Sequence, residues 1–258
     1  MRDEIERREP RIQRDAAAER LFERGAVDSS GYRTGDLGPT HVGVDMGAWE
    51  DFQRGDAPLG MSPEQYQAMK AELEVALARD GLEDADVRLQ GSAAFFYSRN
   101  PDKQFFASPD AVREHCAAAR RDGFDVRPEV EEAAVERYLD AGYAEGPRPR
   151  DKMFDQDYVV TRLPEELSDY DIQISSDTLQ AKMEDYQRDH PDKRVTSSHG
   201  GHWKNDSLQD CFRGLEAWTS TWTRRTGRDV NLAGFPGDGP AGVSGFTDED
   251  WIIRRPQN

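Results

Sequence analysis

The segment DYDIQIS, in the second half of the chain, most strongly constrains the fold. Its apolar residues, Tyr170, Ile172 and Ile174, alternate with polar ones. Successive side chains of a β-strand point to opposite faces of the sheet. We therefore predict a strand that buries its apolar face in a core and presents Asp169 and Asp171 together on the other face.

Helical patterns and two further strand patterns surround this segment. Ser62, Pro63 and Gln65 form a helix-start signal, and Gly81 is a stop signal for the same helix. Further helices are expected at about 109–121, 128–141, 177–188 and 206–226, and further strands at 87–90 and 229–235, whereas 35–61 reads as loop. This order predicts an α+β fold, with a mixed sheet flanked by helices.

The domain organisation follows from composition. Residues 1–60 are predicted to be a charged N-terminal arm and loop, and 61–258 a single domain with a helical insertion at about 99–165. Within the arm, 1–34 is either a solvated tail or a segment that docks on a partner. A basic cluster in the insertion is expected to be a charged linker, with contact to a triphosphate or an RNA end as the alternative; it consists of Arg148, Arg150 and Lys152.

Charge and cysteine content exclude several classes of protein. A formal net charge of −17 argues against an extensive nucleic-acid surface, which needs clustered Lys and Arg. No run approaches the roughly 20 apolar residues of a membrane span, and the N-terminal residues contain no apolar stretch typical of a secretory signal. The two cysteines, Cys116 and Cys211, stand in no paired motif. We expect reduced thiols in core positions and a cytoplasmic protein without membrane contact.

The spacing of Asp169 and Asp171 suggests a metal site. Residues two apart on a strand have their Cα atoms about 7 Å apart, so both carboxylates can converge on one cation. Mg²⁺ suits such a pair, because it is held by one or two carboxylates together with substrate phosphates. The alternative is a surface turn, since Ser-Asp-Tyr-Asp is also a good turn sequence.

A second short motif, LQGS, ends the strand predicted at 87–90. Gly91 allows close backbone approach and Ser92 adds a hydroxyl donor, so the pair can contact a phosphate. Together, LQGS and SDYDIQIS resemble the nucleotidyltransferase superfamily of DNA polymerase β and kanamycin nucleotidyltransferase. The resemblance covers residues 62–98 and 167–240. It implies that Gly91 and Ser92 hold the triphosphate of a nucleotide and that Asp169 and Asp171 bind Mg²⁺.

The chain departs from the family pattern in two ways. The two motifs are separated by residues 93–168, where the family has a short connection. The third carboxylate that the family carries on a later strand is also not obvious. Asp229 is the preferred candidate, with Asn231 on the same strand face and Asp238 in the following loop. Asp169, Asp171 and Asp229 are thus the predicted catalytic residues.

A histidine-containing loop precedes the helix expected at 206–226. His199 and His202 have no third ligand at zinc spacing, so we expect a loop near the nucleotide or acceptor rather than a zinc site. Lys204 follows and is predicted to pair with a phosphate, with a solvated lysine as the alternative. The chain contains no GxxxxGK[ST] loop, which argues against a P-loop NTPase.

The function implied by the resemblance is Mg²⁺-dependent transfer of a nucleoside monophosphate from an NTP to an acceptor hydroxyl, with release of pyrophosphate. The sequence does not identify the acceptor, which can be a protein, a tRNA or a small molecule. A toxin or defence setting rests on family analogy alone. One alternative is a catalytically degenerate nucleotidyltransferase fold that binds a nucleotide or a partner protein. Another is an unrelated acidic interaction protein in which Asp169 and Asp171 are turn residues.

Overall fold

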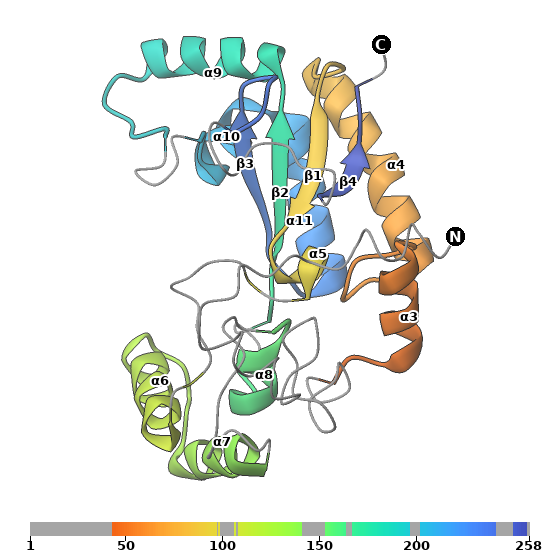
Figure 1. Cartoon of the computed structure of the whole chain (residues 1–258). Helices are drawn as coiled ribbons and strands as arrows, with labels where there is room; N and C mark the ends of the chain where they lie inside the picture. Colours follow the sequence, from red (N-terminus) through yellow and green to blue (C-terminus); the bar gives the residue numbers. More distant parts are fainter. Residues whose placement is uncertain are drawn as a thin grey trace, which may run out of the picture. The chain divides into compact units, whose positions relative to one another are not determined.

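This computed structural model describes residues 43–96, 98, 106, 108–140, 153–163, 167–196, 202–240 and 250–256. Within these ranges the chain forms nine helices and one four-stranded mixed sheet (Figure 1), so the α+β prediction is confirmed at this level. The predicted arm at 1–34, the basic cluster from Arg148 to Lys152 and His199 lie outside the described residues.

The chain divides into two compact units. Unit 1 comprises 1–54 and 95–168, and unit 2 comprises 55–94 and 169–258. The described helices of unit 1 are α3 (Met46–Arg54), α6 (Pro109–Arg121), α7 (Pro128–Asp140) and α8 (Gln156–Thr161). Unit 2 contains α4 (Pro63–Asp80), β1 (Asp86–Gln90), β2 (Tyr170–Ser175), α9 (Asp177–Asp189), α10 (Asn205–Cys211), α11 (Arg213–Thr226), β3 (Val230–Phe235) and β4 (Trp251–Arg254), and the short α5 (Ser92–Phe95) follows β1.

The sheet of unit 2 has the strand order β3-β2-β1-β4. β2 and β3 are parallel, whereas β1 is antiparallel to both β2 and β4. The register pairs Gln90 with Asp171, and Asp171 in turn with Asn231. Three polar residues therefore stand side by side across the three adjacent strands β3, β2 and β1.

The two faces of this sheet differ in chemistry, as the sequence pattern predicts. Tyr170, Ile172 and Ile174 are at most 1% exposed on one face, together with Val87 and Leu89 of β1. In Figure 1, α11 lies behind the strands, and α10 and α11 both contact β3. The opposite face carries the polar residues of β1 and β2. The apolar face thus forms the core, and the polar face remains for a site.

The helix α4 begins and ends as its sequence signals indicate. The Ser62 side chain accepts the Gln65 N–H and the Gln65 side chain accepts the Ser62 N–H, which completes a capping box. Gly81 ends the helix in the left-handed conformation, with φ of 65°.

The helix predicted at 206–226 is two helices, which corrects the sequence interpretation. Phe212, with φ −119° and ψ 98°, separates α10 from α11. The Asp80 carboxylate accepts hydrogen bonds from the N–H groups of Gly214 and Leu215, both at 2.8 Å. The start of α11 is therefore capped by a residue of α4 far away in sequence, which a local pattern does not reveal.

α9 begins at the predicted residue with its cap just before it, whereas α3 was not predicted. The cap of α9 is Ser176, whose hydroxyl accepts the Leu179 N–H at 2.9 Å, whereas Asp177 accepts the Gly237 N–H at 3.0 Å. The loop predicted at 35–61 contains α3, which Asp45 caps through the Gly47 N–H at 2.8 Å. The Gly, Asp and Pro content of 35–61 is the basis of the loop prediction.

In unit 1, α7 contacts both α6 and α8. Arg120 of α6 pairs with Glu131 of α7, and Arg137 of α7 donates to the Val160 carbonyl at 2.9 Å. Cys116 is a free thiol in a core position of this unit, as the sequence led us to expect, whereas Cys211 in unit 2 is free but only half-buried, which corrects its predicted core position. Burial raises the pKa of Cys116, which keeps the thiol in its neutral form. No helix in the described ranges has the length and apolar content of a membrane span.

The close contact of α11 with α4 predicts the effect of adding one methyl group. A Cβ at Gly214 would lie 2.5 Å from the Ala76 carbonyl oxygen, a backbone atom that cannot move aside cheaply. Gly214→Ala should therefore lower the free energy of unfolding by about 1–3 kcal/mol, the usual cost of overpacking. Denaturant unfolding measures it, with Ser220→Ala on the exposed side of α11 as the control. Equal stability of the two variants would contradict the tight crossing.

Candidate functional site

The two sequence motifs meet at the junction of β1 and β2. Gly91 follows Gln90 at the end of β1 and adopts φ of 78°, a conformation that favours glycine. A Cβ at this position would lie 2.9 Å from Oδ2 of Asp171. Because Gly91 has no Cβ, the turn after β1 can lie directly against the Asp171 carboxylate.

Asn231 completes this corner from β3. It pairs with Asp171 across the parallel strands, and its Nδ2 donates to Oδ2 of Asp169 at 2.9 Å. The contact holds the Asp169 carboxylate beside β3, and both aspartates are half-buried. The corner thus contains two carboxylates and one amide, so it carries two formal negative charges.

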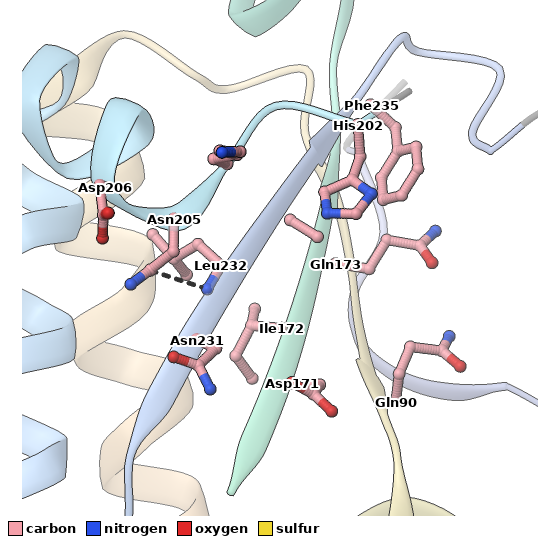
Figure 2. Close-up of a pocket in the computed structure, with 12 residues that line it drawn as sticks. Gln90, Asp171, Ile172, Gln173, His202, Asn205, Asp206, Asn231, Leu232 and Phe235 are labelled. Carbon is pink, nitrogen blue, oxygen red and sulfur yellow. Dashed lines mark hydrogen bonds between the residues drawn. The ribbon is translucent and has the colours of Figure 1, made fainter. Parts of the chain in front are cut away.

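A cleft of about 520 Å³ opens over this part of the sheet in unit 2. Figure 2 shows Asp171 and Asn231 toward one end of the cleft and His202 and Phe235 toward the other. Gln173 lies between them on β2, only 6% exposed. The remaining wall is formed by the first turn of α10 and the residues just before it.

The segment before α10 is attached to the edge of the sheet. The Trp203 N–H donates to the Gly234 carbonyl at 2.9 Å, and the Gly234 N–H donates to the Trp203 carbonyl at 3.1 Å. The Trp203 indole also donates to the Gln180 side chain at 2.8 Å. Because neighbouring side chains of an extended segment alternate, His202 and Lys204 lie on the side opposite Trp203 and line the cleft.

A polar network fixes the first residue of α10. The Asn205 side-chain oxygen accepts the Leu232 N–H at 3.0 Å, the contact drawn as a dashed line in Figure 2, and the Gln209 amide at 3.2 Å. Gln209 also donates to the Thr219 hydroxyl at 3.1 Å. These bonds tie α10 to β3 and α11, so the wall of the cleft is preorganised.

The wall contains one cationic residue, Lys204, and one acidic residue, Asp206. Burial and the nearby Lys204 ammonium both lower the pKa of His202, burial being the larger cause. The imidazole is therefore neutral at pH 7, with one ring nitrogen as donor and the other as acceptor. Lys204 supplies a cationic charge close to His202.

The predicted site residues are distributed unevenly around the cleft. Asp171 and Lys204 line it, and Gly91 lies against Asp171. Asp169 joins the group through its hydrogen bond with Asn231. Asp229, the preferred third acid, is exposed before β3 and contributes its backbone carbonyl to the Tyr170 N–H at 2.8 Å. The β3 residue that pairs with Asp171 is Asn231. Ser92 opens α5 directly after Gly91 and is half-buried.

The donor set constrains how a Mg²⁺ ion fits. In the described part of the chain, no three His, Cys, Asp or Glu residues are grouped as metal ligands. Asp169 and Asp171 offer carboxylate oxygens, and Asn231 offers an amide oxygen, all of which are hard ligands suited to Mg²⁺. Such a set fits an ion that takes its remaining ligands from substrate phosphates and water.

Several cleft residues were not assigned a role from the sequence. Asn231 and Phe235 share one face of β3, as the alternation in VNLAGF indicates, so a closer use of this pattern could have found both. Gln90 could have been placed beside Asp171 only with the strand register. The positions of His202 and Lys204 depend on the pairing of Trp203 with Gly234, for which the sequence holds no local signal.

No protein-family model, curated protein or solved structure matches this chain. The resemblance to nucleotidyltransferases therefore stays a prediction carried by the residues described above.

Asn231→Asp tests the charge balance of the corner. A third carboxylate would replace the hydrogen bond to Asp169 with repulsion, which costs about 1 kcal/mol between partly exposed charges. We expect a lower melting temperature in EDTA than for the wild type, and a larger rise on addition of Mg²⁺. Asn231→Ala, which removes the hydrogen bond without adding charge, is the control. The idea fails if Mg²⁺ raises the melting temperatures of both variants equally.

The lowered pKa of His202 has a predictable pH dependence. An unfolded histidine has a pKa of about 6.5, and folded His202 binds its proton less readily. Its contribution to stability is therefore fully present above about pH 6.5 and is lost as the pH falls through that value toward the lower folded pKa. An NMR titration should give a His202 pKa below that of an unfolded histidine. Lys204→Met should raise it only partly, because burial remains. A wild-type value at or above that of an unfolded histidine would contradict this assignment.

Proposed function

We propose that this chain is a Mg²⁺-dependent nucleotidyltransferase that binds a nucleoside triphosphate in the cleft of unit 2. The observation that carries the proposal is the contact of Gly91 with the Asp171 carboxylate at the ends of adjacent strands. A phosphate-approach motif and a pair of metal ligands need such a meeting point. Two aspartates that only formed a surface turn would not need to lie beside this glycine.

The chemistry at this corner is mainly positioning and charge neutralisation. Asp169 and Asp171 would hold the ion, which would supply neutralisation of the phosphate charge. Gly91 admits the phosphate chain to the backbone after β1, and Ser92 adds a hydroxyl donor. The acceptor hydroxyl oxygen forms a bond to the α-phosphorus and its proton passes to water, while the bond from the α-phosphorus to the bridging oxygen breaks and pyrophosphate leaves with the electron pair.

A second function, nucleotide binding without transfer, is favoured by Asn231. The acceptor hydroxyl must lose its proton during attack, and an amide at the β3 position cannot accept it as a carboxylate would. One oxygen of Asp169 already accepts a hydrogen bond from the Asn231 amide, which leaves fewer carboxylate oxygens open to the acceptor hydroxyl. Slow or absent transfer with intact binding is the expected behaviour of this alternative.

Calorimetry with Mg²⁺ and each of the four NTPs tests the proposal. Wild type should bind at least one Mg²⁺–NTP complex, and Asp169→Ala/Asp171→Ala should lose at least about tenfold in affinity, since each paired charge is worth a kcal/mol or more. Mg²⁺ alone should bind far more weakly, because phosphates complete its coordination. Gly91→Ala should weaken the complex as well, since its Cβ would displace Asp171.

The matched control is Asp185→Ala/Asp189→Ala on α9, which removes two exposed carboxylates away from the cleft. Equal affinities of the two double variants, or no binding of any Mg²⁺–NTP complex to folded wild type, would refute the proposal. Release of pyrophosphate from a bound NTP then separates transfer from binding alone.

A further inference from the structure

The far end of the cleft contains a second group of binding side chains, which we call the aromatic end: His202, Lys204 and Phe235. Phe235 is the last residue of β3, four residues beyond Asn231. At about 3.3 Å per residue along a strand, the backbone at Phe235 is about 13 Å from the backbone at Asn231. The aromatic end is therefore separate from the carboxylate corner, although both open into one cleft (Figure 2).

The backbone of the aromatic end is held rigidly. His202 and Lys204 flank Trp203, which is bonded in both directions to Gly234. The Phe235 carbonyl accepts the Ser176 N–H at 3.1 Å, so the end of β3 is tied to the start of α9. Side chains on such a fixed backbone lose little conformational entropy when a ligand binds.

The two rings suit a flat aromatic ligand. The ring centroids of His202 and Phe235 are 5.6 Å apart with an interplanar angle of 40°, and both residues are half-buried in the cleft wall. Core aromatic residues of unit 2, such as Tyr170 and Trp222, are at most 1% exposed. Partly exposed aromatic faces in a cleft are the usual platforms for nucleobases, which stack regardless of sequence.

Lys204 adds a cation beside these rings. It makes no ion pair with a carboxylate of the described residues. Asp206 also lines the cleft, but it forms no ion pair with Lys204. The neighbouring neutral imidazole can donate one further hydrogen bond. A phosphate group attached to the stacked ring system satisfies both.

We propose that the aromatic end binds a second nucleotide, with its base on His202 and Phe235 and its phosphate at Lys204, and that this nucleotide is the acceptor. The inference rests on the proposed function, since it identifies the acceptor of that reaction. It favours a nucleotide over a protein hydroxyl or an aminoglycoside-like molecule, because neither of these brings an aromatic ring together with an anionic group. Binding at the aromatic end requires no metal ion.

Calorimetric titration of the whole chain with AMP, GMP, CMP and UMP in EDTA tests this. At least one should bind the wild type and Asp169→Ala/Asp171→Ala with the same affinity within about twofold. Phe235→Leu and Lys204→Gln should each weaken that binding by at least about tenfold, in keeping with the worth of one stacked base or one charged contact. Adding the same nucleotide to the wild-type protein should shift the NMR signals of the His202 ring protons. This readout requires no variant.

The matched controls are Tyr186→Leu and Lys193→Gln, which remove an aromatic ring and a lysine at the end of α9 in the same unit. Neither should change the affinity. The inference is overturned if no monophosphate binds, if Phe235→Leu and Lys204→Gln bind as tightly as the controls, or if His202 does not respond. Monophosphate binding without any Mg²⁺–NTP binding would instead refute the proposed function while the aromatic end remains a nucleotide site. Mg²⁺–NTP binding without monophosphate binding would refute the aromatic end alone.

Discussion

The antiparallel pairing of β1 with β2 is the constraint on which the rest of the cleft depends. Its register places Gln90 opposite Asp171, so the turn at Gly91 lies against the carboxylate. A shift of one residue would exchange the two faces of β2 and turn Asp171 into the core. The buried Tyr170, Ile172 and Ile174 oppose such a shift, because their burial would be lost. The core of unit 2 therefore maintains the geometry of the site.

The polar face of the sheet is stabilised by a second, buried cluster. The Arg88 guanidinium bonds Asp86 and Asp250, each at 2.7 Å, and its side chain is 7% exposed. Burial works against the charge of Arg88, but the two carboxylates outweigh it and raise the pKa. The cluster holds the start of β4 on β1, next to Gln173 in the register. The charges of this cluster are paired with one another inside the fold. The side chains of Lys204 and Asp171, in contrast, line the cleft.

The parallel strand β3 decides what the corner can do chemically. It brings Asn231, rather than an acid, beside Asp171, and the amide donates to Asp169. This arrangement leaves less repulsion than three carboxylates would, and it leaves fewer groups able to accept a proton. Both consequences are compatible with binding of a metal–phosphate complex. Asn231 most directly affects the rate of nucleotidyl transfer.

The sequence by itself determined the features that depend on neighbouring residues. The capping box of Ser62 and Gln65, the stop at Gly81 and the two faces of β2 follow from hydrogen bonds and side-chain alternation within a few residues. Only the tertiary structure decided the rest. The break at Phe212 depends on the Asp80 cap of α11, and the positions of His202 and Lys204 depend on the bonds between Trp203 and Gly234. These contacts join residues far apart in the chain, so no local pattern in the sequence specifies which partner each group finds.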